Sequence, residues 1–239
     1  QLLRSNDTII QLEVIRDNNK MVFALKTYPM FFSSKKYTNK DTCFRMMNND
    51  IAYINNGSLK RSYLKEIWKA MKNSKGLIID DRNYPSDFPI YDLSSYLMPQ
   101  TSAFVKFSNT SIQTPGLFTF TETLNAGKKN KDYYKGKVVV LINEITQSSA
   151  EFHAMAYKMI PNVVFIGSTT AGADGNVSQF YLPGGIFTMI SGIGVYYPDG
   201  KETQRIGIIP DIEMKPTING IKKGNDELLE KAVEIIQGK

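Results

Sequence analysis

A serine stands where a predicted strand passes into a predicted helix, a position in which α/β enzymes can carry a nucleophile. The apolar run 138–142 is short and rich in valine, which indicates a buried parallel strand. Ser148 follows it, and Phe152, Met155 and Met159 then recur at helical spacing. The first backbone N–H groups of a helix lack intrahelical acceptors, and the helix dipole is positive there. A hydroxyl at this point can attack a carbonyl whose developing negative charge these groups stabilise.

The same residues have a second interpretation that involves no chemistry. Residues 148–151 read S-S-A-E, which is also the pattern of a capping box. In a capping box Ser148 would accept the N–H of Glu151, and the Glu151 carboxylate would accept the N–H of Ser148. The local pattern alone leaves both interpretations open.

Length and composition indicate a globular chain with one main core. Its 239 residues suffice for one sizeable α/β core, or for a core plus a fragment of another domain, with 42% hydrophobic and 22% charged residues. No apolar run approaches the roughly 18 residues of a membrane span. The single cysteine, Cys43, excludes an internal disulfide and a cysteine-based metal site, and we expect it to be structural.

Charge and glycine spacing give no sign of a nucleic-acid partner or of a cofactor. The net charge is +6, and the densest lysine cluster, at 128–137, is not part of a recognisable aromatic-basic nucleic-acid-binding module and is best explained as a solvated loop. The glycines between 167 and 175 lack the spacing of dinucleotide-binding and phosphate-binding loops. We therefore expect no nucleic acid, metal or cofactor.

Short buried strands alternate with amphipathic helices through most of the chain. This rhythm predicts an α/β fold with a mainly parallel sheet. Beyond Gly172, turn residues such as Gly184-Gly185 separate strand-like segments and predict hairpins. The predicted strands are 51–54, 77–79, 138–142 and 163–166, and the predicted helices are 62–72, 149–159 and 226–237.

The N-terminal segment predicts a hairpin that could not stand alone. Residues 8–16 and 21–26 have strand patterns, and Asp17-Asn18-Asn19 supply a turn between them. An irregular linker is predicted from 28 to 49, where lysine pairs and asparagines replace any periodic pattern.

Four segments in register resemble the C-terminal processing (tail-specific) serine peptidase family. Residues 76–87 read G-L-I-I-D-D-R-N-Y-P-S-D, similar to the family pattern G-L-I-L-D-L-R-N-N-P-G-G. Residues 146–151 (T-Q-S-S-A-E) match the nucleophile segment S-A-S-E, residues 167–172 (G-S-T-T-A-G) are similar to G-x-x-T-F-G, and residues 207–212 (G-I-I-P-D-I) are similar to G-I-x-P-D-I. The resemblance extends over about 50–215 and implies a ClpP/crotonase-type spiral core.

The resemblance also implies a domain organisation and a setting. Members carry a PDZ-like domain before the protease core, so residues 1–27 are expected to be its C-terminal remnant and residues 28–239 the catalytic core. The expected substrates are unstructured polypeptides or their C-terminal tails. Members are mostly exported, which implies a periplasmic or cell-envelope location.

Carried over residue by residue, the resemblance makes Ser148 the nucleophile. The oxyanion hole would be formed by the backbone N–H of Ser149 and by one N–H from the turn at Ser86 and Asp87. Each position also has a structural explanation, as a turn residue, a cap or a strand-end hydroxyl. The residues expected to support the site are Glu151, Thr170, Gly172 and Gln204.

The general base departs from the family pattern. Tail-specific members use a lysine in T-F-G-K-G, whereas residues 170–175 read T-A-G-A-D-G and contain none. Asp174 is weak as a sole base for serine, and D-G-N is also a turn pattern. The only histidine, His153, points about 140° away from Ser148 around the helix. The tricorn-core-like branch takes its base from a histidine before the PDZ-like region, so we expect the base upstream of this chain. That branch supports its histidine through a glutamate whose place is held here by Gln204.

Three functions remain open from the sequence. The first is a serine endopeptidase that works through an acyl-enzyme, inactive as this fragment alone because its base lies upstream. The second is a catalytically silent, peptide-binding member of the same family. The third is crotonase-type acyl-CoA chemistry, for which the sequence offers no recognisable pantetheine-binding signature.

Overall fold

The computed structural model of the chain describes residues 6–28, 42–47 and 50–238, and it consists of two units, residues 1–40 and 41–239. In the first unit, β1 (Ile9–Arg16) and β2 (Asn19–Lys26) pair antiparallel along their full length. Asp17 and Asn18 between them have φ values of 50° and 63°, as a two-residue type I′ turn requires. The predicted hairpin is confirmed, and most of the predicted linker lies outside the described residues.

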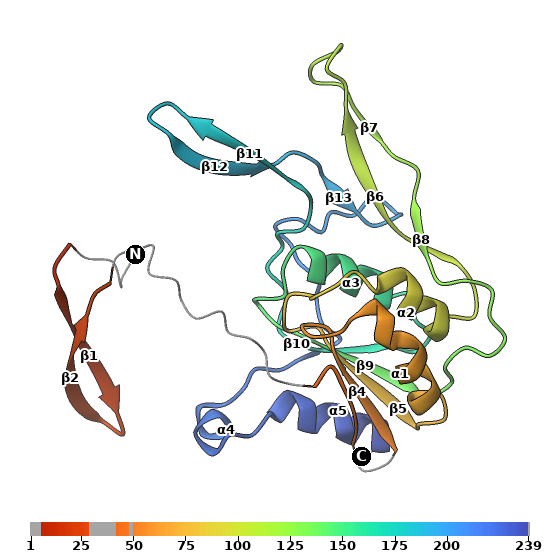
Figure 1. Cartoon of the computed structure of the whole chain (residues 1–239), viewed down its shortest axis with the longest axis horizontal. Helices are drawn as coiled ribbons and strands as arrows, with labels where there is room; N and C mark the ends of the chain where they lie inside the picture. Colours follow the sequence, from red (N-terminus) through yellow and green to blue (C-terminus); the bar gives the residue numbers. More distant parts are fainter. Residues whose placement is uncertain (1–5, 29–41, 48–49, 239) are drawn as a thin grey trace. The chain divides into compact units, whose positions relative to one another are not determined.

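A six-stranded sheet forms the centre of the second unit (Figure 1). All neighbouring strands pair parallel except β3, an edge strand that pairs antiparallel with β4. This confirms the predicted α/β class with a mainly parallel sheet. In sheet order the strands are β14 (Ile212–Glu213), β10 (Val164–Gly167), β9 (Lys137–Ile142), β5 (Gly76–Asp80), β4 (Ile51–Asn55) and β3 (Phe44–Met47).

Successive residues of each strand point to opposite faces of the sheet. Both faces carry apolar side chains, so helices cover both of them. Leu77 and Ile79 pack in the larger core with three helices, whereas Ile78 packs on the opposite face with Leu228 and Ala232. Among the described residues, no helix combines the length and apolar character needed to cross a bilayer. The helices of the larger core are α1 (Leu64–Met71), α2 (Ile90–Leu97) and α3 (Ser149–Tyr157), and a 3-10 turn at Arg61–Tyr63 precedes α1. The other face is covered by α5 (Glu227–Gln237), which follows the short helix α4 (Ile218–Lys223).

The predicted elements of the core are confirmed to within about two residues, but several observed elements were not predicted, among them one strand and one helix of the core. The edge strand β3 lies within the segment expected to be irregular, and its pairing with β4 explains it. Helix α2 follows directly on Pro89 and buries Ile90, Leu93 and Leu97. Both are short, so neither contains enough repeats of its pattern to be recognised.

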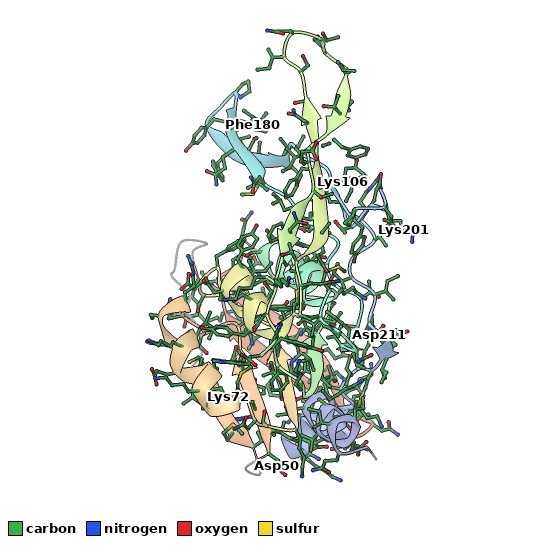
Figure 2. All side chains as sticks on the ribbon, turned by 90° about the vertical axis from the view of Figure 1, so that its right-hand side faces the viewer. Asp50, Lys72, Lys106, Phe180, Lys201 and Asp211 are labelled. Atoms are coloured by element: carbon green, nitrogen blue, oxygen red, sulfur yellow. The ribbon has the colours of Figure 1, made fainter. Side chains whose placement is uncertain are left out.

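Two β arms extend from the core on the side of α3 (Figure 1). One is built on β6 (Ser102–Thr110), which pairs with β7 (Phe118–Phe120), β8 (Leu124–Ala126) and β13 (Val195–Tyr196). The other is the hairpin of β11 (Val177–Leu182) and β12 (Ile186–Ser191), which confirms the predicted change to hairpins. Figure 2 shows Lys106 and Phe180 on these arms, at the end of the unit opposite Asp50 and Lys72.

Candidate active site

Ser148 lies between β9 and α3, at the carboxyl edge of the parallel sheet, where α/β proteins bind their ligands. Its backbone has φ 54° and ψ −116°, a conformation that costs a non-glycine residue on the order of 1–3 kcal/mol. An ordinary N-cap residue has extended φ and ψ instead. A strained turn between strand and helix is the geometry that presents a nucleophilic serine in α/β hydrolases.

The segment has the arrangement of a capping box, but only one half of it is a well-formed hydrogen bond. The Ser148 N–H donates to Glu151 Oε2 at 3.1 Å. The Ser148 hydroxyl makes no side-chain cap hydrogen bond of comparable geometry. Glu151 therefore holds the main chain of Ser148, and the hydroxyl is left available.

Glu151 is fully buried and accepts hydrogen bonds from two segments of the chain. Besides Ser148, its donors are the Thr170 hydroxyl at 2.5 Å, the Gly172 N–H at 2.7 Å and the Ala173 N–H at 2.9 Å. Thr170 Oγ1 in turn accepts the N–H of Ile208 at 2.7 Å. One carboxylate thus fixes the serine turn against the loop after β10.

Gly172 has a conformational reason to be glycine in this network. Its φ is 64°, and a Cβ atom there would lie 3.0 Å from the main chain of Arg205. The positions expected to support the site from the sequence, Glu151, Thr170 and Gly172, are therefore brought together by direct hydrogen bonds.

Thr146 is a buried residue of the same turn that the sequence analysis did not single out. Its hydroxyl donates to the carbonyl of Asp81 at 2.9 Å and accepts the N–H of Asn143 at 3.0 Å. Its carbonyl accepts the N–H of Ala171 at 3.0 Å. Thr146 thus joins the loops that follow β5, β9 and β10. The signal in the sequence was a hydroxyl residue two positions before the serine, which is too common to be recognised alone.

A cavity of about 490 Å³ opens beside Ser148. Ser148, Ser149 and Asp174 are among its polar lining residues, and aromatic side chains from three separate parts of the chain also line it. The Phe152 ring lies 5.6 Å from Phe88 and 6.2 Å from Phe107, centre to centre. The other lining residues are Tyr84, Ser108, Asn109, Thr121, Gly175, Asn176 and Ile193.

Asp174 lies in this cavity wall as a buried acid, not as the exposed turn residue that its sequence suggests. It is 4% exposed, and burial raises its pKa from 3.8 to about 7, with a further contribution from the charge of Glu151. Oδ1 accepts the N–H of Gly175 at 2.7 Å. Gln204, which the sequence analysis placed among the supporting residues, donates its amide to the carbonyls of Asp174 and Ile193 at 2.7 and 2.9 Å.

His153 belongs to the core, in agreement with its predicted direction away from Ser148. It is fully buried, its Nδ1 lies 2.6 Å from the carbonyl of Ser149, and its ring packs edge-on against Phe88. Burial lowers its pKa from 6.5 to about 4. His153 is absent from the residues that line the cavity.

The turn at Ser86 and Asp87 departs in part from its expected role. The Ser86 N–H already donates to the Asn56 carbonyl at 3.0 Å, and its hydroxyl donates to the Leu59 carbonyl at 2.7 Å. The Asp87 carboxylate accepts the N–H groups of Arg61 and Phe88, which lower its pKa. This turn can therefore offer the N–H of Asp87, but not that of Ser86, as an oxyanion donor.

Comparisons with known proteins agree with this architecture. A match to peptidase family S41 extends over residues 50–214. The nisin-resistance protein of Lactococcus lactis subsp. lactis is 30% identical over 148 residues, which are 59% of this chain and 46% of that protein. The chain spans less than half the length of the curated relatives it matches.

Solved structures share the fold at low sequence identity. Mature CPAF, solved in complex with lactacystin, has a TM-score of 0.73 at 15% identity, covering 99% of this chain and 70% of CPAF. The photosystem II D1 C-terminal processing protease has a TM-score of 0.55 at 16% identity, covering 89% of this chain and 57% of the protease. The chain belongs to peptidase family S41, a family of C-terminal processing peptidases.

Proposed function

We propose that the protein is a serine endopeptidase that cleaves unstructured polypeptides or C-terminal tails through an acyl-enzyme on Ser148. The observation that carries this proposal is the strained backbone of Ser148, held by Glu151 at the start of α3 with its hydroxyl beside a cavity. Strain of this kind persists only where surrounding contacts impose it, and it gathers at active sites. A purely structural cap would need none of it.

In the proposed reaction, Ser148 Oγ attacks the scissile carbonyl while a general base takes its proton. The carbonyl oxygen becomes negative and accepts the N–H of Ser149, which has no intrahelical acceptor at the first position of α3, and that of Asp87. The base then donates the proton to the leaving amine, and the C–N bond breaks. Water, deprotonated by the same base, hydrolyses the ester and regenerates Ser148.

The general base is the part of this mechanism that the described residues do not supply. The residues that line the cavity include no histidine or lysine. We place the base upstream of the catalytic core, as in the tricorn-core-like branch, with residues 1–27 as the end of a PDZ-like domain and residues 28–239 as the core. We also assign the protein to the periplasm or cell envelope. This chain alone should then hydrolyse peptides hardly at all, because binding and oxyanion terms remain but proton transfer does not.

The experiment compares this chain with the full-length protein. Full-length protein should digest casein and react with a fluorophosphonate, Ser148→Ala should lose both activities, and Ser149→Ala should keep most of them because it retains its backbone N–H. Activity that survives Ser148→Ala would refute the assignment.

A catalytically silent, peptide-binding member is the second candidate, and the absence of a base among the cavity-lining residues favours it. A full-length protein of this kind would bind extended peptides with the affinity of its Ser148→Ala variant. It would neither cleave them nor react with the fluorophosphonate.

A further inference from the structure

A buried amide and a buried acid at the carboxyl edge of the sheet are joined by one hydrogen bond, and each keeps one oxygen without a partner. Asn56 follows β4 and Asp81 follows β5, and Asn56 Nδ2 donates to Asp81 Oδ1 at 2.8 Å. Asn56 Oδ1 and Asp81 Oδ2 are two of the six buried side-chain polar atoms of the described residues that lack a hydrogen-bond partner. Both are acceptors, so a donor has to be added before either is satisfied.

A proton on Asp81 supplies that donor. A neutral carboxyl group donates through one oxygen and accepts through the other, which complements an amide and allows the pair to close two hydrogen bonds. Either orientation of the amide is satisfied by this proton. If the Asn56 amide were turned over, its oxygen would lie 2.8 Å from Asp81 Oδ1, and the proton would bridge that contact instead.

The Asp81 carboxyl has too few donors to remain charged. Within the described residues Asn56 alone donates to it, whereas Glu151, which is equally buried, accepts four hydrogen bonds. A buried carboxylate with this little compensation takes up a proton. The sequence agrees, because Asp81 stands where the family pattern of residues 76–87 has a leucine, which is an uncharged side chain.

The titratable groups around Asp81 do not favour its charged form. Burial raises the pKa of Asp81 well above 3.8, the hydrogen bond from Asn56 lowers it, and the charge of Asp80 raises it. Tyr157 on α3 faces the pair, with its hydroxyl 3.2 Å from Asn56 Nδ2, and the charge of Asp81 adds to the burial that raises the pKa of this tyrosine. Arg82, the next residue along the chain, pairs with Asp80. Asp81 therefore keeps its proton to a higher pH than an exposed aspartate does.

The main chain of this pair supports both turns that are proposed to form the oxyanion hole. The Asn56 carbonyl accepts the N–H of Ser86 at 3.0 Å, in the turn that offers the Asp87 N–H. The Asp81 carbonyl accepts the hydroxyl of Thr146 at 2.9 Å, in the turn that carries the nucleophile. A change in the spacing between Asn56 and Asp81 would therefore move one oxyanion donor relative to the attacking serine.

We propose that Asp81 is a positioning residue held as the neutral acid, and that the proton it shares with the Asn56 amide oxygen keeps the two turns of the oxyanion hole at their spacing. This proposal rests on the proposed function. When Asp81 loses the proton, two oxygens face each other and the turns move apart. Asp81 stabilises the fold as the acid, so its contribution is fully present below about pH 4 and is lost as the pH rises through its raised pKa.

The test uses full-length protein with Asp81→Ala and Asp81→Asn, and Asp199→Asn as the matched control. Asp81→Ala removes the pair, and we expect kcat to fall by about 10²-fold with KM within about threefold, because a misplaced oxyanion donor weakens the transition state and not substrate binding. Asp81→Asn carries an NH2 group in place of the acid O–H and closes the same two hydrogen bonds at every pH. It should restore kcat to within about threefold of wild type. Asp199 lies in an exposed turn, with its side chain 53% exposed, and Asp199→Asn should change neither constant.

The pH profile separates this role from a merely structural one. As the pH rises, wild-type kcat should fall below that of Asp81→Asn, and the ratio of the two should grow to about 10²-fold once Asp81 is ionised.

Infrared spectroscopy reads the protonation state of Asp81 without any turnover. At neutral pH the difference spectrum between wild type and Asp81→Asn should contain the C=O band of a carboxylic acid. The same subtraction removes every other acid of the protein, Asp174 included.

Three results would overturn the proposal. The first is a difference spectrum with carboxylate bands in place of the acid band, which would mean that Asp81 is charged and that a buried water supplies the missing donors. The second is an Asp81→Asn variant that does not fold or that loses as much kcat as Asp81→Ala. The third is a pH profile of kcat that is the same in Asp81→Asn and wild type. Survival of activity in Ser148→Ala would instead refute the proposed function, and the infrared band would still show whether Asp81 is the neutral acid.

Discussion

Glu151 should contribute more to stability than any surface acid of this protein, because four donors depend on one buried carboxylate. Glu151→Ala removes their acceptor, and each buried donor left unsatisfied costs about 1–3 kcal/mol. At the lower limit, four unsatisfied donors together reduce the free energy of unfolding by about 4 kcal/mol. A marginally stable domain has a free energy of unfolding of only about 5 kcal/mol. We expect Glu151→Ala to be at least about 4 kcal/mol less stable than wild type, or not to fold.

Glu151→Gln should be less severe, and the geometry gives the reason. If its NH2 group takes the place of Oε1, the Thr170 hydroxyl can rotate to accept from it, and only the Gly172 N–H faces another donor. If the NH2 group takes the place of Oε2, the N–H groups of Ser148 and Ala173 both face a donor. The first orientation should be adopted, at a cost of about 2–3 kcal/mol for one unsatisfied donor and the loss of the charge.

Urea denaturation followed by tryptophan fluorescence can measure these differences, because the chain has one tryptophan, Trp68, stacked on Tyr96 in the core unit. Glu66→Gln is the control, since Glu66 is exposed and forms a surface ion pair with Lys69. It should leave the free energy of unfolding nearly unchanged, because exposed ion pairs contribute little to stability. A Glu151→Gln variant as stable as Glu66→Gln would refute the reasoning.

Three further predictions concern strain and pH. Ser148→Gly should raise the free energy of unfolding by about 1 kcal/mol and abolish activity, because glycine adopts φ 54° without strain; a less stable variant in chemical denaturation would contradict this. In this chain, burial raises the pKa of Asp174 from 3.8 to about 7, so its contribution to stability is fully present below about pH 4. The free energy of unfolding should fall by on the order of 4 kcal/mol as the pH rises to 7, and this pH dependence should be flatter in Asp174→Asn. Burial lowers the pKa of His153 from 6.5 to about 4, so its contribution to stability is fully present above pH 6.5. The free energy of unfolding should fall by roughly 3 kcal/mol as the pH decreases to 4, and His153→Leu should remove that decrease in the same measurement.

The sequence predicted the elements that repeat a local pattern. The valine run of β9 and the apolar stripe of α1 each determine their own structure, and both lie where expected. The position of Ser148 at the start of α3 follows from the same local patterns. Its positive φ could not be predicted, because it is imposed by Glu151 and by loops far away in the sequence.

The cavity and its polar partners could not be predicted for the same reason. Phe88, Phe107 and Phe152 come from three elements whose meeting depends on the whole fold. Asp174 has a turn sequence, and only the packing around it makes it buried and unpaired. The engaged N–H of Ser86 likewise depends on a carbonyl 30 residues earlier, at Asn56.

Identification of the residue that a fluorophosphonate modifies would test the central claim most directly. Full-length protein would be labelled, digested and mapped by mass spectrometry, with Ser148→Ala and Ser149→Ala treated in parallel. We predict a single adduct on Ser148, absent from Ser148→Ala and retained in Ser149→Ala. An adduct on Ser149, or labelling that persists in Ser148→Ala, would contradict the assignment of Ser148 as the nucleophile.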